Sequence, residues 1–116
     1  MKLSKLTAPR PTQATIEVLG DPIVVTYDRA IITGGFFASR SGTPVRATLA
    51  ELLISWDVTG EDGKPYQPPA SANGSRPQEW LKLFEPIPDD LIMAVYRGVL
   101  DDFYAGKAAG GDSSVS

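Results

Sequence analysis

Two hydrophobic periods divide the chain into an N-terminal β region and a helical remainder. Between residues 14 and 27, two short runs, 15–19 and 23–27, are rich in β-branched side chains, and in the first run apolar and polar positions alternate. Alternation with a period of two predicts half-buried strands. The turn-forming sequence GDP at 20–22 separates the two runs, so we expect a β-hairpin over 14–27.

The next segment, 44–56, has the 3.6-residue period of a helix. Its apolar face consists of Val45, Leu49, Leu52, Leu53 and Trp56. Thr43 is suited to cap this helix, and Pro44 to occupy its first position, where a missing N–H costs nothing. Turn formers fill 57–65, so we expect the helix to end at Trp56 in a tight acidic loop.

Two more helices are predicted in the C-terminal half. Ser75 and Gln78 have capping-box spacing, which predicts a short helix over 77–84. A wide apolar stripe over 88–105 predicts the longest helix of the chain, with Gly106 suited to its C-terminal end.

These elements predict an α+β fold in a single domain, 14–106, with an N-terminal β-hairpin packed on a small bundle of about three helices. An isolated hairpin is marginally stable, and we expect the helix at 44–56 to support it. The proline-containing segment 1–13 predicts an extended arm, and the Gly-, Ala- and Ser-rich segment 107–116 a disordered tail. Both termini are therefore expected to be flexible.

Composition narrows the classes of function. The 116 residues carry 11 basic and 14 acidic side chains, a net charge of −3, which argues against nucleic acid as the main partner. There is no cysteine and no histidine, so thiolate chemistry and the commonest general base are absent. No apolar run approaches membrane-spanning length and no signal peptide is recognisable, so the cytoplasm is the expected compartment.

Acidic clusters do not form a recognisable catalytic or metal site. Counted from Asp57, the EF-hand positions 6 and 12 are Asp62 and Pro68, where a calcium loop needs Gly and Glu. The acidic pairs at 89–90 and 101–102 are interpreted as solvated helix faces. We therefore expect no catalytic residue, no cofactor and no metal, and we do not expect an enzyme.

The segment around Phe36 and Phe37 leaves two interpretations open. Two adjacent aromatic side chains after a Gly-Gly pair either tuck into the core or form an exposed anchor for a partner. Arg29, Arg40 and Arg46 likewise form either a small basic patch near this loop or three separate surface arginines.

The sequence LLISWDVT at 52–59, followed by EDGKP at 61–65, resembles the tail assembly chaperones of long-tailed (siphovirus-type) bacteriophages. The residues that carry the likeness are Ser55, Trp56, Asp57, Asp62, Gly63, Lys64 and Pro65. The sequence VLDDF at 99–103 is similar to the acidic-aromatic end of the family's C-terminal helix. The likeness spans about residues 14–105, but GGFF at 34–37 and the connector 67–80 have no counterpart.

This resemblance implies a non-catalytic protein that binds the long, aggregation-prone tape measure protein and assists assembly of the tail tube around it. It also implies self-association, a longer form made by frameshifting, a place in the host cytoplasm during infection, and absence from the finished particle. Candidate partner contacts are Phe36, Phe37, Trp80 and Phe84, because they lie on a loop or on a helix too short to be buried all round.

Two other roles remain open at this point. One is a structural head–tail connector or tail terminator subunit, which stays in the phage particle. The other is a small regulatory or nucleic-acid-binding module, which would show salt-dependent retention on DNA.

Overall fold

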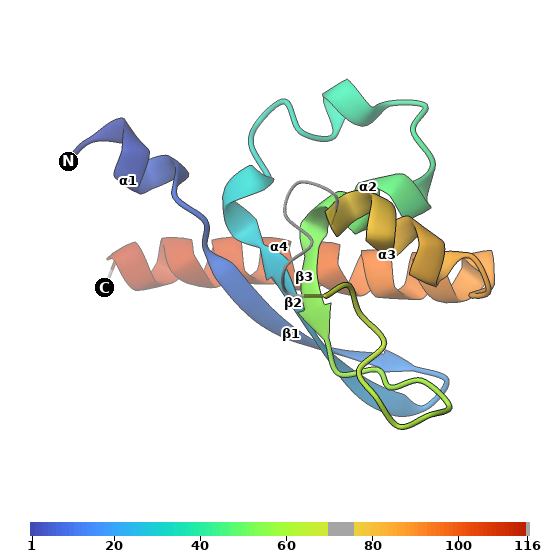
Figure 1. The fold of residues 1–116 in the computed structure, drawn as a ribbon. Helices are drawn as coiled ribbons and strands as arrows, with labels where there is room; N and C mark the ends of the chain where they lie inside the picture. The colour runs from blue at the N-terminus through green and yellow to red at the C-terminus, as the bar shows by residue number, and fades with distance from the viewer. Residues whose placement is uncertain (70–75, 116) are drawn as a thin grey trace.

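The computed structural model describes the backbone of residues 1–69 and 76–115 and the side chains of these residues outside 106–115. It has an α+β fold, which confirms the predicted class: an antiparallel sheet of strand order β1-β2-β3, with helices on one side of it (Figure 1). Along the chain the elements are α1 (Leu3–Thr7), β1 (Pro11–Val18), β2 (Asp21–Asp28), the 3-10 turns η1 (Arg29–Ile31) and η2 (Ala38–Arg40), α2 (Val45–Leu52), β3 (Leu53–Trp56), α3 (Arg76–Phe84) and α4 (Asp89–Val115).

The predicted hairpin is confirmed, but its turn lies earlier than the sequence GDP indicates. Leu19 and Gly20 form a two-residue turn with φ of 54° and 82°. Positive φ at both positions gives the twist that joins two antiparallel strands closely. Asp21 and Pro22 therefore already belong to β2, where Pro22 lies opposite Glu17 near the hairpin tip.

The N-terminal arm is shorter than predicted. β1 begins at Pro11, so residues 11–13 belong to the sheet, and α1 interrupts the extended arm that precedes it. The carboxylate of Asp28 accepts hydrogen bonds from the backbone N–H groups of Arg10 (3.0 Å) and Ala30 (2.9 Å). This contact fixes the base of the arm, while residues 1–10 are all exposed.

The predicted helix over 44–56 is wrong in its last four residues, 53–56. The helix ends at Leu52, and β3 then pairs with β2, with Trp56 opposite Val25 and Leu53 opposite Tyr27. β-Branched and aromatic residues favour strands, and the free edge of β2 offers hydrogen-bond partners. Sheet pairing therefore overrides the helical period of this segment. The start also differs, since Pro44 is the N-cap and no side chain caps the helix, so Thr43 does not have the capping role predicted for it.

Helix α4, rather than the helix at 44–56, supports the hairpin. It packs against β1 across one face of the sheet (Figure 1). At their closest approach, a Cβ atom added to Gly98 would lie 2.6 Å from the side chain of Ile16. Glycine at this position therefore lets the helix and strand approach each other directly.

The two C-terminal helices begin close to where the sequence predicts. α3 spans Arg76–Phe84, and α4 starts at Asp89, although Ser75 of the predicted capping box lies outside the described residues. The predicted end of the last helix near Ala105 is wrong, because the helix runs to Val115. Gly106 therefore lies inside α4 rather than at its end, as do Gly110 and Gly111. The predicted disorder of 107–116 stays a prediction.

Candidate functional site

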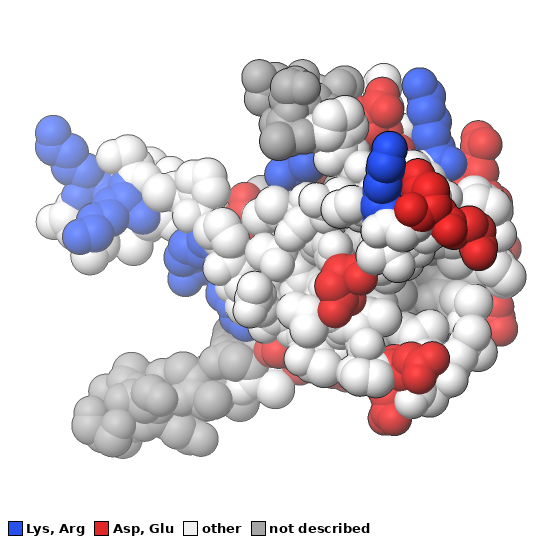
Figure 2. Space-filling view, turned by 60° about the horizontal axis from the view of Figure 1, so that its bottom comes forward, with Lys and Arg blue, Asp and Glu red and all other residues white. Residues whose placement is uncertain are grey.

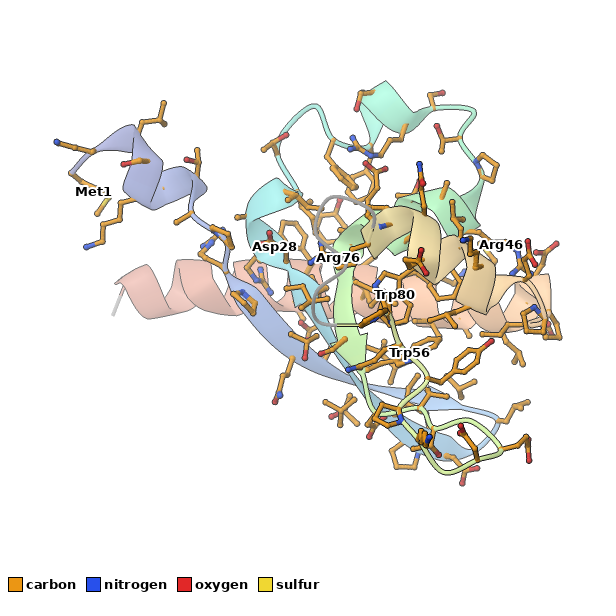
Figure 3. All side chains as sticks on the ribbon, viewed as in Figure 1. Met1, Asp28, Arg46, Trp56, Arg76 and Trp80 are labelled. Atoms are coloured by element: carbon orange, nitrogen blue, oxygen red, sulfur yellow. The ribbon has the colours of Figure 1, made fainter. Side chains whose placement is uncertain are left out.

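The aromatic residues on α3 belong to the core. Trp80 and Phe84 are fully buried, and their rings lie 5.2 Å and 5.7 Å from the ring of Trp56 on β3. Trp56 and Trp80 lie close together between the sheet and α3 in Figure 3. The prediction that Trp80 and Phe84 are exposed on a short helix is wrong, because α3 packs on α2 and closes over β3.

Phe36 is also a core residue, which supports the first of the two interpretations of this loop. Its side chain is buried, and the guanidinium carbon of Arg40 lies 3.8 Å from the centre of its ring. Arg40 also forms two hydrogen bonds of 2.8 Å to the carboxylate of Glu51 on α2. Phe37 is half-buried and contacts the Phe36 ring edge-to-face, so the loop is held closed and offers no exposed aromatic pair.

The three arginines near this loop do not form a basic patch. Arg29, Arg40 and Arg46 are each in an ion pair, with Asp102, Glu51 and Asp89 respectively. Arg46 also donates to the backbone carbonyls of Phe84 and Ile87, which fixes the link between α3 and α4. The three ion pairs join η1 to α4, η2 to α2 and α2 to α4, respectively.

The residues of the family resemblance hold a tight loop at the end of β3. Backbone N–H of Asp57 donates to Val24 O (3.1 Å), and its carboxylate accepts from Val24 N (2.9 Å). Asp62 accepts from the backbone N–H of Lys64 (3.0 Å), and Gly63 has φ of 78°. Ser55 lies in β3, and a bridge between Thr59 and Pro65 closes the loop.

This loop is also tied to the helices. Trp56 Nε1 donates to the carbonyl of Tyr66 (2.5 Å), and the Tyr66 hydroxyl donates to the carbonyl of Leu83 on α3 (2.5 Å). Trp56, Asp57 and Asp62 therefore have structural roles in this loop. Trp56 also lines an apolar groove at the hairpin tip.

An open apolar groove of about 260 Å³ lies at the hairpin tip, between the β1–β2 turn, the start of the β3 loop and the first turns of α4. Its lining residues are Val18, Leu19, Asp21, Ile23, Trp56, Val58, Ile87, Leu91, Ile92 and Val95. Nine of these ten residues are apolar, and Leu19 is 81% exposed. A concave, mostly apolar surface with an exposed leucine at its rim is typical of a binding site.

The fold explains why the groove is open. Val18 continues the apolar face on which Ile16 packs against Gly98, but the hairpin diverges from α4 towards its tip (Figure 1). Trp56, Ile92 and Val95 form the buried floor, while Val18 and Leu91 are only half-buried. The groove is thus a continuation of the core that lacks a covering element.

Acidic side chains accompany the groove. Asp21 lines it, and the exposed residues Asp57 and Asp90 are direct neighbours in sequence of its lining residues. Figure 2 shows a largely uncharged face on which most charged groups of the body are acidic, with some basic groups among them, while the charged groups of the projecting arm are basic. The groove therefore favours an apolar ligand that carries positive charge at its edges.

A polar network lies at the other end of the sheet. The hydroxyl of buried Tyr27 donates to Asp102 Oδ2 (2.7 Å) and accepts from Arg29 Nη2 (3.0 Å). Burial, and then the carboxylate of Asp102, raise the pKa of Tyr27 far above the usual value for tyrosine. The phenol thus stays protonated and joins α4 to the sheet, so the prediction of a solvated Asp102 is wrong.

Within the described ranges, no three acidic side chains come close enough together to hold a metal ion. In the same part of the chain, no helix combines the length and the apolar character needed to cross a membrane. Neither finding identifies a further site.

The groove was not predictable from the sequence, because each lining residue has a structural explanation on its own. One signal was available, namely Leu19 directly before Gly20 in a two-residue hairpin turn. Turns of this type favour Asn or Asp at that position, so an exposed leucine there needs another reason. Comparisons of the chain with protein-family models, curated proteins and solved structures found no match.

Proposed function

We propose that this protein is a non-catalytic tail assembly chaperone that holds an apolar segment of a phage tape measure protein in the groove at the hairpin tip. The observation that carries the proposal is the groove itself. It leaves apolar side chains open to solvent beside a core in which residues such as Trp80 and Phe84 are fully buried. A holding chaperone needs such a surface to cover aggregation-prone segments.

Two further features support this proposal. The sequence at 52–65 resembles tail assembly chaperones, and these residues build the loop that forms one wall of the groove. The chain also contains no histidine or cysteine, and the raised pKa of Tyr27 makes that phenol a poor base or nucleophile. In this role the protein acts in the host cytoplasm, assists assembly of the tail tube and leaves before the phage particle is complete.

The shape of the groove specifies its ligand. Its volume of about 260 Å³ and its apolar lining suit a few apolar side chains, such as those at i, i+3 or i+4 of an amphipathic helix. Because Asp21 lines the groove, we expect lysine or arginine beside those apolar residues.

Co-expression with the tape measure protein of the same phage tests this proposal. The wild-type chain should keep the tape measure protein soluble and co-purify with it. The double variant Val18→Thr with Leu19→Lys should lose this effect, because it removes apolar surface and adds a repelling charge. Tyr104→Lys is the matched control, since Tyr104 is exposed but lies outside the groove.

Equal co-purification by the groove variant and the wild type contradicts the proposal. Mass spectrometry of purified particles provides an independent check. Finding the protein there at the copy number of a ring would favour the connector or tail terminator role instead.

A further inference from the structure

Large apolar side chains with high exposure are found in two main places on the described chain. Met1, Leu3 and Leu6 lie on the N-terminal arm, with 90%, 72% and 62% of their surface exposed, and Leu19 lies at the rim of the groove. The remaining one, Tyr104, stands apart on α4. The arm thus combines unburied apolar residues with a position away from the body (Figure 3).

The arm has the chemistry that the groove favours. Leu3 and Leu6 are three residues apart in α1, so they share one side of this short helix. Residues 1–13 contain three basic and no acidic side chains, which leaves eight basic and 14 acidic side chains in the rest of the chain. The arm is therefore an apolar, basic segment, and the groove is an apolar surface with acidic neighbours.

We propose that the N-terminal arm of one copy docks into the hairpin-tip groove of a second copy. Leu3 and Leu6 occupy the apolar floor, and Lys2 or Lys5 lies near Asp21, the acidic residue of the lining. Figure 2 shows the basic arm projecting from a body whose charged groups on this face are mainly acidic, so the two surfaces are complementary in charge as well as in polarity.

While α1 is folded, the arm cannot reach the groove of its own chain. The arm joins β1 at Pro11, whereas the groove begins at Val18, the far end of the strand, about 23 Å away for seven strand residues. The five steps from Leu6 to Pro11 cover at most about 18 Å when fully extended. Leu3 reaches only if α1 unfolds and the whole arm is stretched, so a second copy supplies the arm.

The contact is head-to-tail, because the arm and the groove are different surfaces of one chain. Such contacts produce rings when the rotation closes and open chains when it does not. One short arm buries far less than the roughly 800 Å² per partner of a stable interface, so we expect association in the micromolar range or weaker. The arm would also compete with any other apolar ligand of the groove.

Sedimentation velocity over a range of concentrations tests the docking. Wild-type chain should show a mass that rises with concentration. Leu3→Asp with Leu6→Asp, which alters only the arm, and Leu19→Lys, which alters only the groove rim, should each weaken association at least tenfold. Tyr104→Lys should behave as the wild type, and unchanged association in either of the first two variants overturns the proposal.

Mixing the two variants gives a sharper result. The groove of the arm variant is intact, and so is the arm of the rim variant, so an equimolar mixture should regain association as a heterodimer. A mixture that stays monomeric overturns head-to-tail docking. All altered positions are exposed, so thermal unfolding should be close to that of the wild type and misfolding is readily recognised.

Arm docking does not rest on the proposed function, and the two fail separately. A chain lacking residues 1–8 should lose self-association but bind the tape measure protein at least as well, because its groove is free. If the wild-type chain associates with itself but does not bind the tape measure protein, only the proposed function is contradicted. Normal partner binding with monomeric wild-type chain would contradict only the arm docking.

Discussion

The middle of β1 and the tip of the β1–β2 hairpin have opposite surroundings. In the middle of the strand Ala14 and Ile16 are buried, and Gly98 lets α4 approach Ile16 closely. Towards the tip the same apolar face continues into Val18, which is only half-buried, and Leu19 in the adjoining turn is exposed. The strand is thus covered along one part and uncovered at its tip.

This difference distinguishes apolar residues that stabilise the fold from those available to a partner. The prediction of partner contacts relied on location in loops and short helices, and it selected Trp80 and Phe84, which are core residues. The open surface lies instead at the hairpin tip, where the turn at Leu19 meets the loop after β3 and the start of α4. Exposure of an apolar side chain next to a packed core is the more informative criterion.

The largest expected effect is the difference in unfolding free energy between a variant of the packed core and a variant of the groove. Phe84→Ala should lower the free energy of unfolding by about 3 to 5 kcal/mol, because it opens a cavity between α3 and Trp56. Leu19→Ser should change it by less than about 0.5 kcal/mol, because the side chain is already in water. Urea unfolding of both variants measures the contrast, and similar losses would remove the distinction between the two regions.

The second effect tests the close approach of α4 to β1. Gly98→Val should lower the free energy of unfolding by about 1 to 3 kcal/mol, since its side chain overlaps that of Ile16. Adding Ile16→Ala should recover part of the loss by making room. If the double variant is no more stable than Gly98→Val, the overlap with Ile16 is not the cause.

The third effect concerns the polar end of the sheet. Burial raises the pKa of Tyr27 in the folded chain, so an unfolded tyrosine, with a pKa of about 10, loses its proton first. The contribution of Tyr27 to stability is therefore complete below about pH 10 and is lost as pH rises above it. Tyr27→Phe should cost about 1 kcal/mol at pH 8 through loss of the bond to Asp102.

The stability gap between wild type and Tyr27→Phe should narrow as the pH rises from about 9 to about 11, roughly one unit either side of the reference pKa. Denaturant unfolding at several pH values measures this gap. A gap that is constant over that range would show that Tyr27 ionises equally in the folded and unfolded chain.

The smallest effect has the opposite sign. Leu19→Asn should raise the free energy of unfolding by about 0.5 to 1 kcal/mol, because Asn accepts the positive φ of this turn better than leucine does. The same variant should weaken binding at the groove. A more stable protein that binds less well would show that Leu19 serves recognition, whereas retained binding would show that it does not.

Local patterns predicted most of the elements, because hairpin alternation, helix periods and helix starts depend on neighbouring residues. They failed at Leu53–Trp56, where pairing with β2 decides between helix and strand. They also failed for Asp102, whose partner Tyr27 is 75 positions away in sequence. The groove was not predictable for the same reason, since three segments distant in sequence form it and its openness depends on where α4 stops covering the sheet.

The most direct test of the account is methyl NMR of the protein titrated with an apolar, basic helical segment of the tape measure protein. Val18, Leu19, Ile23 and Val58 should shift, while the buried methyl groups of Leu49 and Leu52 on α2 should not. This pattern would identify the groove as the binding surface. Shifts confined to residues outside the groove, or no shifts at saturating segment, would contradict the central claim.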